Sequence, residues 1–87
     1  MTDFRILIVE DEEAIAKMIQ MNLRVAGYKT DIYMDGLKAA EHIKEDSRYD
    51  LALLDVMVPG MDGFELLEVL KPYKIPVIFL TAKDDIE

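Results

Sequence analysis

The chain has 87 residues, with 18 Asp or Glu against 10 Lys or Arg and a formal net charge of −8. This length allows one small domain, and the acidic excess argues against direct binding to nucleic acid or to an anionic membrane surface. Because there is no cysteine, disulfides and thiolate metal sites are excluded. No apolar run has the length of a membrane span, and no signal-peptide pattern is present. We therefore expect one cytoplasmic domain over residues 1–87.

The first strand and helix are predicted from a change of hydrophobic period. Residues 4–9 form a short, nearly continuous apolar run rich in β-branched residues, which is typical of a strand buried on both faces. Residues 12–26 then carry apolar side chains at helical spacing, followed by Gly27 as the expected C-terminal cap. The expected inner face of this helix consists of Ile15, Met18, Ile19, Leu23 and Ala26.

Three further strands and two helices follow in alternation. Residues 29–34 predict a more polar edge strand, and Asp35 is expected to cap a helix that ends near residue 46. Residues 51–54 predict a buried strand that ends at Asp55, and the Pro-Gly and Asp-Gly pairs within 56–63 predict a loop. A short helix over 64–70, closed by Pro72, and an apolar strand over 76–80 complete the predicted order.

The alternation predicts an α/β fold with a parallel sheet and right-handed crossovers. The two apolar runs, 4–9 and 51–54, are expected to be central strands, whereas the polar second strand belongs at an edge. This placement favours the strand order 2-1-3-4, a flavodoxin-like doubly wound sheet in which the order reverses between strands one and three.

Acidic residues follow two of the central strands. Glu10 and Asp11 come after the first strand and Asp55 after the third, at the edge where ligands of open α/β sheets bind. A single acid there is more often a turn or cap residue, but three carboxylates that converge repel one another, and Mg²⁺ with oxygen ligands relieves that repulsion. Asp55 beside such a cation is a candidate nucleophile toward phosphorus, and the hydroxyl of Thr81 ends the fourth strand on the same edge.

Three segments, 6–12, 51–67 and 77–83, resemble the receiver domains of response regulators in two-component signalling. The resemblance implies that Asp55 is the phosphoacceptor and that Asp11, Glu10, Asp55 and the backbone carbonyl of Met57 surround Mg²⁺. It further implies that Thr81 is the switch hydroxyl and that Pro59 and Gly60 shape the loop after the acceptor. By the same resemblance, the phosphoryl donor is a sensor histidine kinase.

The resemblance also suggests which kind of output domain a full-length parent protein would carry. The sequence of residues 56–63 most resembles the corresponding segment of receivers that are joined to winged-helix DNA-binding domains. Transcription regulation through such an output domain is therefore the expected role of a full-length parent. The chain itself is not expected to contact DNA, and it is expected to act as a phosphoprotein in a phosphorelay rather than as an enzyme.

The resemblance stops after the fourth strand. A complete receiver has a fifth strand and two more helices, and its lysine after strand five has no counterpart among these 87 residues. We therefore expect a truncated receiver whose fourth strand lies at an apolar edge, which favours homodimers or exchange of elements. The alternative is a folded fragment that cannot be phosphorylated and acts as an association module.

Two other interpretations have weaker support. An aspartyl-phosphate phosphatase of the haloacid-dehalogenase type needs a second Asp where Met57 stands. A flavodoxin-like mononucleotide binder needs a Ser/Thr/Gly-rich loop after the first strand, where the acidic run would repel phosphate. His42, the single histidine, lies in a polar helical segment and is expected to be a surface residue.

Overall fold

The computed structural model describes residues 3–80 as four strands and three α-helices with one short 3₁₀ turn. In chain order the elements are β1 (Arg5–Val9), α1 (Glu13–Val25), β2 (Lys29–Tyr33), α2 (Gly36–Glu45), β3 (Leu51–Asp55), α3 (Gly63–Leu70), the 3₁₀ turn (Lys71–Tyr73) and β4 (Val77–Leu80). No helix in this part of the chain is long and apolar enough to cross a membrane.

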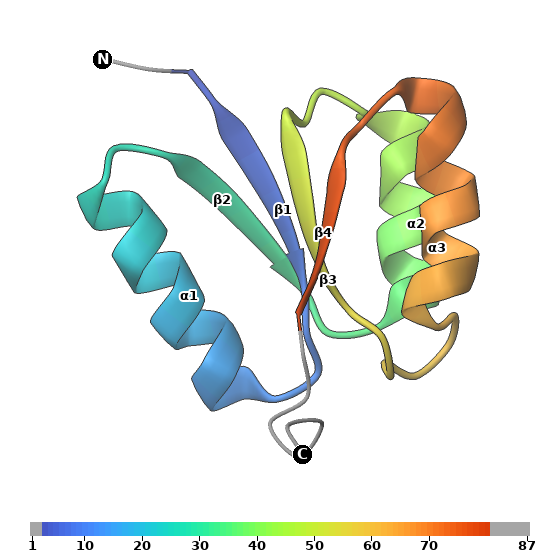
Figure 1. The fold of residues 1–87 in the computed structure, drawn as a ribbon, viewed down its shortest axis with the longest axis horizontal. Helices are drawn as coiled ribbons and strands as arrows, with labels where there is room; N and C mark the ends of the chain where they lie inside the picture. Colours follow the sequence, from blue (N-terminus) through green and yellow to red (C-terminus); the bar gives the residue numbers. More distant parts are fainter. Residues whose placement is uncertain (1–2, 81–87) are drawn as a thin grey trace.

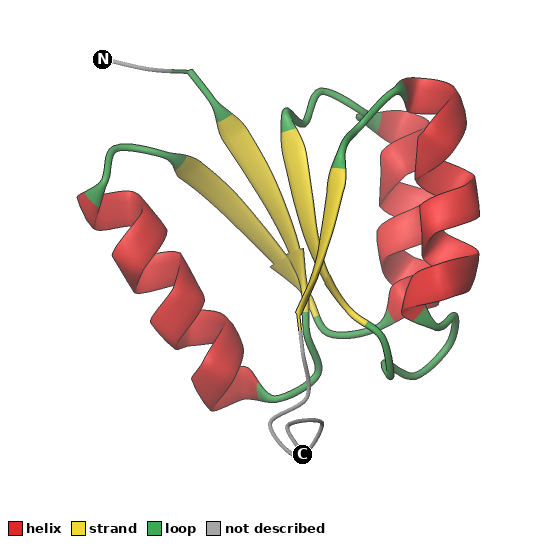
Figure 2. Cartoon of the chain, viewed as in Figure 1, coloured by secondary structure: helices red, strands yellow, loops and turns green. Residues whose placement is uncertain are grey.

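The four strands are parallel and lie in the order β2-β1-β3-β4. This confirms the predicted strand order and the incomplete flavodoxin-like fold, with the polar strand β2 at one edge. Figure 1 shows the sheet between α1 on one side and the α2–α3 pair on the other, and Figure 2 shows the same layers by type of element. All strands point toward the end of the molecule at which the loops into the helices begin.

Alternation along the strands divides the core into two clusters. The larger cluster lies between the sheet and α2 and α3, where Leu7, Val9 and Leu54 are fully buried. The smaller cluster lies under α1 and is formed by Ile6, Ile8 and Ala16. Figure 1 agrees with this division, because α1 packs beside β2 and β1, and no other helix formed by residues 3–80 lies on that face of the sheet.

The inner face of α1 was only partly predicted. Ala16 is buried, and Ile19 and Leu23 pack around it, so the helix contacts the sheet through a narrow stripe of small and branched residues. Met18 is 57% exposed, because two residues correspond to about 200° around an α-helix from Ala16. Ala26 is also exposed, beyond the last turn of the helix. The predictions for Met18 and Ala26 were therefore wrong.

The ends of the helices follow their sequence signals. Gly27 has a φ of 99° directly after α1, as expected of a C-terminal glycine. Asp35 caps α2, because its side chain accepts a hydrogen bond from the backbone N–H of Lys38 at 3.0 Å. After α3 ends, the chain continues directly into the 3₁₀ turn, which contains Pro72. Proline is tolerated there because the first positions of a helical turn do not need a backbone N–H donor.

A hydrogen-bonded chain of side chains joins α2 to the sheet and includes His42. The Tyr49 hydroxyl donates to Asp31 at 2.7 Å and lies 2.9 Å from Nε2 of His42, while Arg5 donates to the same Asp31 carboxylate at 2.9 Å. The His42 ring also stacks on Tyr33, with 5.0 Å between ring centroids. His42 is therefore half-buried and bonded, and its prediction as a surface residue was wrong. The polar helix around it gave no signal, since its partners come from distant parts of the chain.

Tyr49→Phe tests the stability that this chain of bonds contributes. Tyr49 is 6% exposed, and the variant leaves its half-buried partners, Asp31 and His42, without their bond to the hydroxyl. We expect a loss of about 1 kcal/mol in the free energy of unfolding. Urea unfolding at neutral pH measures it. Tyr73→Phe is the matched control, because Tyr73 is 40% exposed and its change is expected to stay within about 0.5 kcal/mol.

The unmodified chain and Tyr49→Phe can also be compared as a function of pH. Burial and then the hydrogen bond to Asp31 raise the pKa of Tyr49 well above its ordinary value. A raised folded pKa means that the contribution is complete below about pH 10, where the unfolded phenol starts to ionise, and is lost as the pH rises further. The stability difference between the unmodified chain and Tyr49→Phe should therefore shrink above about pH 10. If the stability difference between the two proteins did not change with pH, the hydrogen bond from the Tyr49 hydroxyl to Asp31 would be contradicted.

Candidate metal and phosphoryl site

The carboxyl ends of β1 and β3 bring the predicted acidic residues together. Val9 of β1 lies in register with Leu54 of β3, so the next residues, Glu10 and Asp55, meet at the end of the two strands. Glu10 is also fixed to β2, because its N–H donates to the carbonyl oxygen of Tyr33 at 3.1 Å. The site therefore lies where the strand order reverses, between β1 and β3.

Glu10, Asp11 and Asp55 form one cluster of carboxylates. One oxygen of each side chain lies within 4.8 Å of an oxygen of the other two. The three differ in exposure: Glu10 is buried, Asp55 is half-buried and Asp11 is exposed. This gradient places one acid under the site and one at its rim, with Asp55 between burial and solvent. An ion could thus enter from solvent and reach oxygens on all three.

The surroundings of Glu10 in this cluster raise the pKa of its carboxyl group. Burial raises the pKa of Glu10, and the nearby Asp55 and Asp11 raise it further, whereas the hydrogen bond from the backbone N–H of Glu12 at 3.0 Å lowers it. The net pKa of Glu10 lies above the ordinary value, mainly because burial disfavours the charged carboxylate and secondly because close negative charges disfavour its ionisation. A divalent cation between the carboxylates would reverse this penalty, and the donor set, which consists of hard oxygen ligands, fits Mg²⁺.

The loop after Asp55 forms the outer wall of the site. Met57 is 78% exposed, and its backbone N–H lies 3.5 Å from an Asp55 carboxylate oxygen, a long contact. A hollow of about 620 Å³ lies against this loop and is lined by Asp11, Val56, Met57, Val58, Pro59, Asp62 and Phe64. Gly60, at the tip, adopts a φ of 86°, a conformation that glycine enters without strain. Pro59 and Gly60 lie in this loop, and their predicted role in shaping it stays a prediction.

Thr81, the predicted switch hydroxyl, lies outside the described residues 3–80. Among the predicted metal-site residues that are described, Glu10, Asp11 and Asp55 converge, and Met57 shares the hollow with Asp11. Sequence reasoning placed Glu10, Asp11 and Asp55 together because each stands at a strand end on the same edge of the sheet, whereas Met57 was named only through the resemblance to receiver domains.

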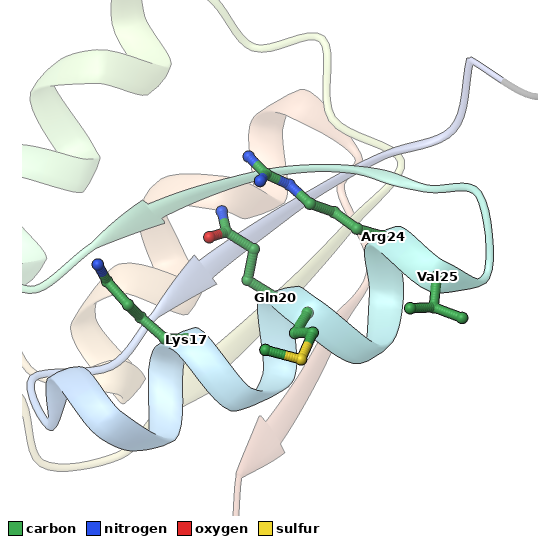
Figure 3. Close-up of a pocket in the computed structure, with 5 residues that line it drawn as sticks. Lys17, Gln20, Arg24 and Val25 are labelled. Atoms are coloured by element: carbon green, nitrogen blue, oxygen red, sulfur yellow. The ribbon is translucent and has the colours of Figure 1, made fainter.

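A second hollow lies on the outer face of α1, away from the acidic cluster. Lys17, Gln20, Met21, Arg24 and Val25 line it, and Figure 3 shows these side chains on successive turns of the helix. Met21 and Val25 are among the most exposed apolar side chains of the described chain. The lining holds no carboxylate or imidazole, so it offers Mg²⁺ and phosphoryl chemistry none of the groups found at the strand ends.

Comparisons with known proteins agree with the fold. A model of the response regulator receiver domain family matches residues 6–87. The chain therefore belongs to the response regulator receiver domain family. The resemblance of segments 6–12, 51–67 and 77–83 is thereby confirmed at the level of the family.

Solved structures of receiver domains superpose closely on the chain. A response regulator from Chloroflexus aurantiacus is 32% identical with a TM-score of 0.85, and the match covers 98% of this chain and 72% of that one. The receiver domain of a sensor histidine kinase from Pseudomonas aeruginosa, with a magnesium ion coordinated in the active site cleft, is 31% identical with a TM-score of 0.84 over 94% of this chain and 70% of that one.

A third structure has a different domain context. The N-terminal domain of a response regulator/sensory box/GGDEF three-domain protein from Carboxydothermus hydrogenoformans is 38% identical, with a TM-score of 0.84 over 90% of this chain and 64% of that one. The chain thus spans 64% to 72% of the lengths of these three structures.

Proposed function

We propose that the chain is a phospho-accepting receiver in which Asp55 takes a phosphoryl group with the assistance of Mg²⁺. The observation that carries this proposal is the convergence of Glu10, Asp11 and Asp55 within 4.8 Å at the point of strand-order reversal. Membership of the receiver family supports it, as does the magnesium ion in the active site cleft of the Pseudomonas aeruginosa receiver.

The residues present fit a magnesium site. Asp11 and Asp55 would supply carboxylate oxygens and Met57 a backbone carbonyl oxygen, while buried Glu10 contributes the charge beneath them. Mg²⁺ takes one or two carboxylates and keeps other positions for water and phosphate oxygens. When bound, it neutralises charge on the phosphoryl group during transfer.

The chain's own residues supply position and the nucleophile. An Asp55 carboxylate oxygen forms the new P–O bond, and the P–N bond of a phosphohistidine breaks, so the imidazole leaves with the electron pair and takes up a proton. Pairing of β3 with β1 and β4 fixes the backbone of Asp55 at the strand end. The exposed rim at Asp11 leaves the donor access from solvent.

The donor that we propose is a sensor histidine kinase, and the setting is the cytoplasm. The phosphorylated domain would control an output domain, most simply a DNA-binding domain that regulates transcription, by a shift between two surface states. In this role the chain is a phosphoprotein that takes part in its own phosphorylation and is not an enzyme with a separate substrate.

Mass spectrometry of the intact chain tests the phosphoacceptor role. The chain is incubated with a small acyl phosphate, with Mg²⁺ or with EDTA. We expect a gain of one phosphoryl group that requires Mg²⁺, because the cation would neutralise negative charge between the carboxylates and the incoming phosphoryl group. If no phosphoryl group is gained under any condition, the association module is the better account. An equal gain with Mg²⁺ and with EDTA would contradict the role proposed for the cation.

A second proposal, self-association, rests on the sheet face that α1 leaves uncovered. We define the open face as Leu51, Leu53, Ile78 and Leu80. Leu51 and Leu53 pack on the α1 side, and alternation puts Ile78 and Leu80 on that side because Val77 and Phe79 face the other cluster. Ile78 is 53% exposed.

The proposed occupant of the open face is a second copy of the chain. Among the described residues β4 pairs with β3 alone, so its outer backbone groups are available to another strand. Neither β4 nor the open face carries a charged side chain, so two chains of net charge −8 can meet there without like charges in contact. An apolar patch of this kind marks an association site.

Ile78→Lys tests this proposal. A charge at the centre of the open face should convert a dimer at micromolar concentration into a monomer, because a buried, unpaired ammonium is costly. Size-exclusion chromatography with light scattering measures the mass. Val25→Lys is the control, since Val25 is 84% exposed on α1 and outside the open face. A dispersed monomer in the unmodified chain would refute self-association.

A further inference from the structure

The loop that follows Asp55 is held against the start of α2 by a backbone contact. The N–H of Gly36, the first residue of α2, donates to the carbonyl oxygen of Pro59 at 2.8 Å. Gly36 is buried by this contact. In Figure 1 the loop between β3 and α3 and the loop that begins α2 lie at the same end of the molecule as the carboxyl ends of the strands.

This contact leaves no room for a side chain at Gly36. A Cβ there would overlap the carbonyl oxygen of Met61 and lie 2.8 Å from its carbonyl carbon, which are both backbone atoms. The loop backbone therefore approaches the helix as closely as a peptide group allows, and any side chain at position 36 would push the loop away from α2.

Asp35 holds the tip of the same loop. Its Oδ1 accepts the α2 capping bond from Lys38, and its carboxylate also faces Gly60, where an added Cβ would lie 2.9 Å from Cγ of Asp35. Gly60 has a φ of 86°, so the loop turns sharply at the point of contact. Asp35 thus connects the N-terminus of α2 to the turn of the loop at Gly60.

Both supports of this contact are anchored to the rest of the fold. Behind Gly36, α2 is anchored in the core by Ala39, Ala40 and Ile43, which are all buried. At its other end the loop is closed by the Gly63 N–H, which donates to the carbonyl oxygen of Val56 at 2.8 Å. Met57 lies between these two fixed points and next to the acidic cluster, and its own contact to Asp55 is long at 3.5 Å. Its position is therefore set by the loop rather than by Asp55.

We propose that Asp35 and Gly36 are positioning residues of the magnesium site: by fixing the loop tip at Pro59 to Met61 they hold the Met57 backbone beside Asp55. This inference rests on the proposed function, in which the Met57 carbonyl is a metal ligand. Neither residue touches the ion. They act on it only through the loop, as outer partners that orient metal ligands do in other sites.

The test compares Gly36→Ala with Gly27→Ala. Gly27 has a φ of 99° at the end of α1, so an alanine there strains the backbone and lowers stability without touching the loop. We expect Gly36→Ala to weaken Mg²⁺ binding by about tenfold or more, and Gly27→Ala to leave it unchanged. Isothermal titration with Mg²⁺ gives the affinities, and urea unfolding shows that both proteins are folded during the titration.

A second measurement separates positioning from general loss of stability. In metal-free protein, the amide resonances of Met57 and Val58 should shift in Gly36→Ala and stay in place in Gly27→Ala. If Gly36→Ala does not fold, Asp35→Ser serves instead, because serine keeps the α2 cap but withdraws the carboxylate from Gly60. We expect this variant to weaken Mg²⁺ binding in the same direction, by a smaller factor.

The outcomes distinguish this inference from the proposed function. If the unmodified chain binds Mg²⁺ and the folded Gly36→Ala or Asp35→Ser variant binds it equally well, the positioning role is refuted and the phosphoacceptor role stands. If the unmodified chain binds no Mg²⁺, the proposed function fails, and the positioning role fails with it.

Discussion

Asp55→Asn is expected to abolish the gain of a phosphoryl group. An amide at position 55 keeps the shape of the side chain but offers no carboxylate nucleophile. The same change removes one anionic oxygen from the cluster of Glu10, Asp11 and Asp55, so Mg²⁺ binding should also weaken by about tenfold or more. Intact-mass analysis after incubation with an acyl phosphate, together with a Mg²⁺ titration, measures both effects.

Two controls show whether the loss of phosphorylation comes from the change of net charge or from unfolding. Glu41→Gln, at an exposed position of α2, changes the net charge equally and should leave phosphorylation intact. Asp55→Asn itself should unfold at no lower urea concentration than the unmodified chain without metal, because one of three mutually repelling carboxylates is gone. Phosphorylation that persists at full level in Asp55→Asn would place the acceptor elsewhere.

Leu54→Ala is expected to have the largest effect on stability. Leu54 is fully buried in the cluster that α2 and α3 cover, and it lies in register between Val9 and Phe79. Removing a buried leucine side chain costs about 2–5 kcal/mol, since the cavity does not close completely. A domain of this size has total stability on the order of 5–10 kcal/mol, so the variant should be close to unfolded at physiological temperature.

Leu37→Ala is the matched control for that variant. Leu37 is 46% exposed on α2, and alanine is at least as good a helix former, so its stability should change by less than about 0.5 kcal/mol. Urea unfolding followed by circular dichroism measures both. Equal losses in the two variants would mean that the core does not lie between the sheet and α2.

The sheet was predictable because its signals are local. Residues 4–9 and 51–54 are apolar on both faces and became the central strands β1 and β3, whereas the polar run 29–34 became the edge strand β2. The chain order of strands then fixed where the carboxyl ends meet. For that reason Asp55 could be assigned to the same site as Glu10 and Asp11 from the sequence alone, although it is distant from them along the chain.

The features that were missed depend on packing between distant segments. The exposure of Met18 follows from the narrow stripe through which α1 meets the sheet, which periodicity over one helix does not define. The bonds of His42 depend on Tyr49 and Asp31 from other elements. The contact between Gly36 and Pro59 is made by backbone atoms and leaves no hydrophobic pattern in the sequence.

The account depends most directly on a single cation site shared by Glu10, Asp11 and Asp55. A titration of the isotope-labelled chain with Mg²⁺, followed by NMR, tests it residue by residue. We predict that resonances of all three residues and of Met57 shift together along one saturable curve, and that Asp11→Asn weakens the whole set. Shifts at Asp11 without any at Asp55, or no saturable shifts at all, would contradict the account.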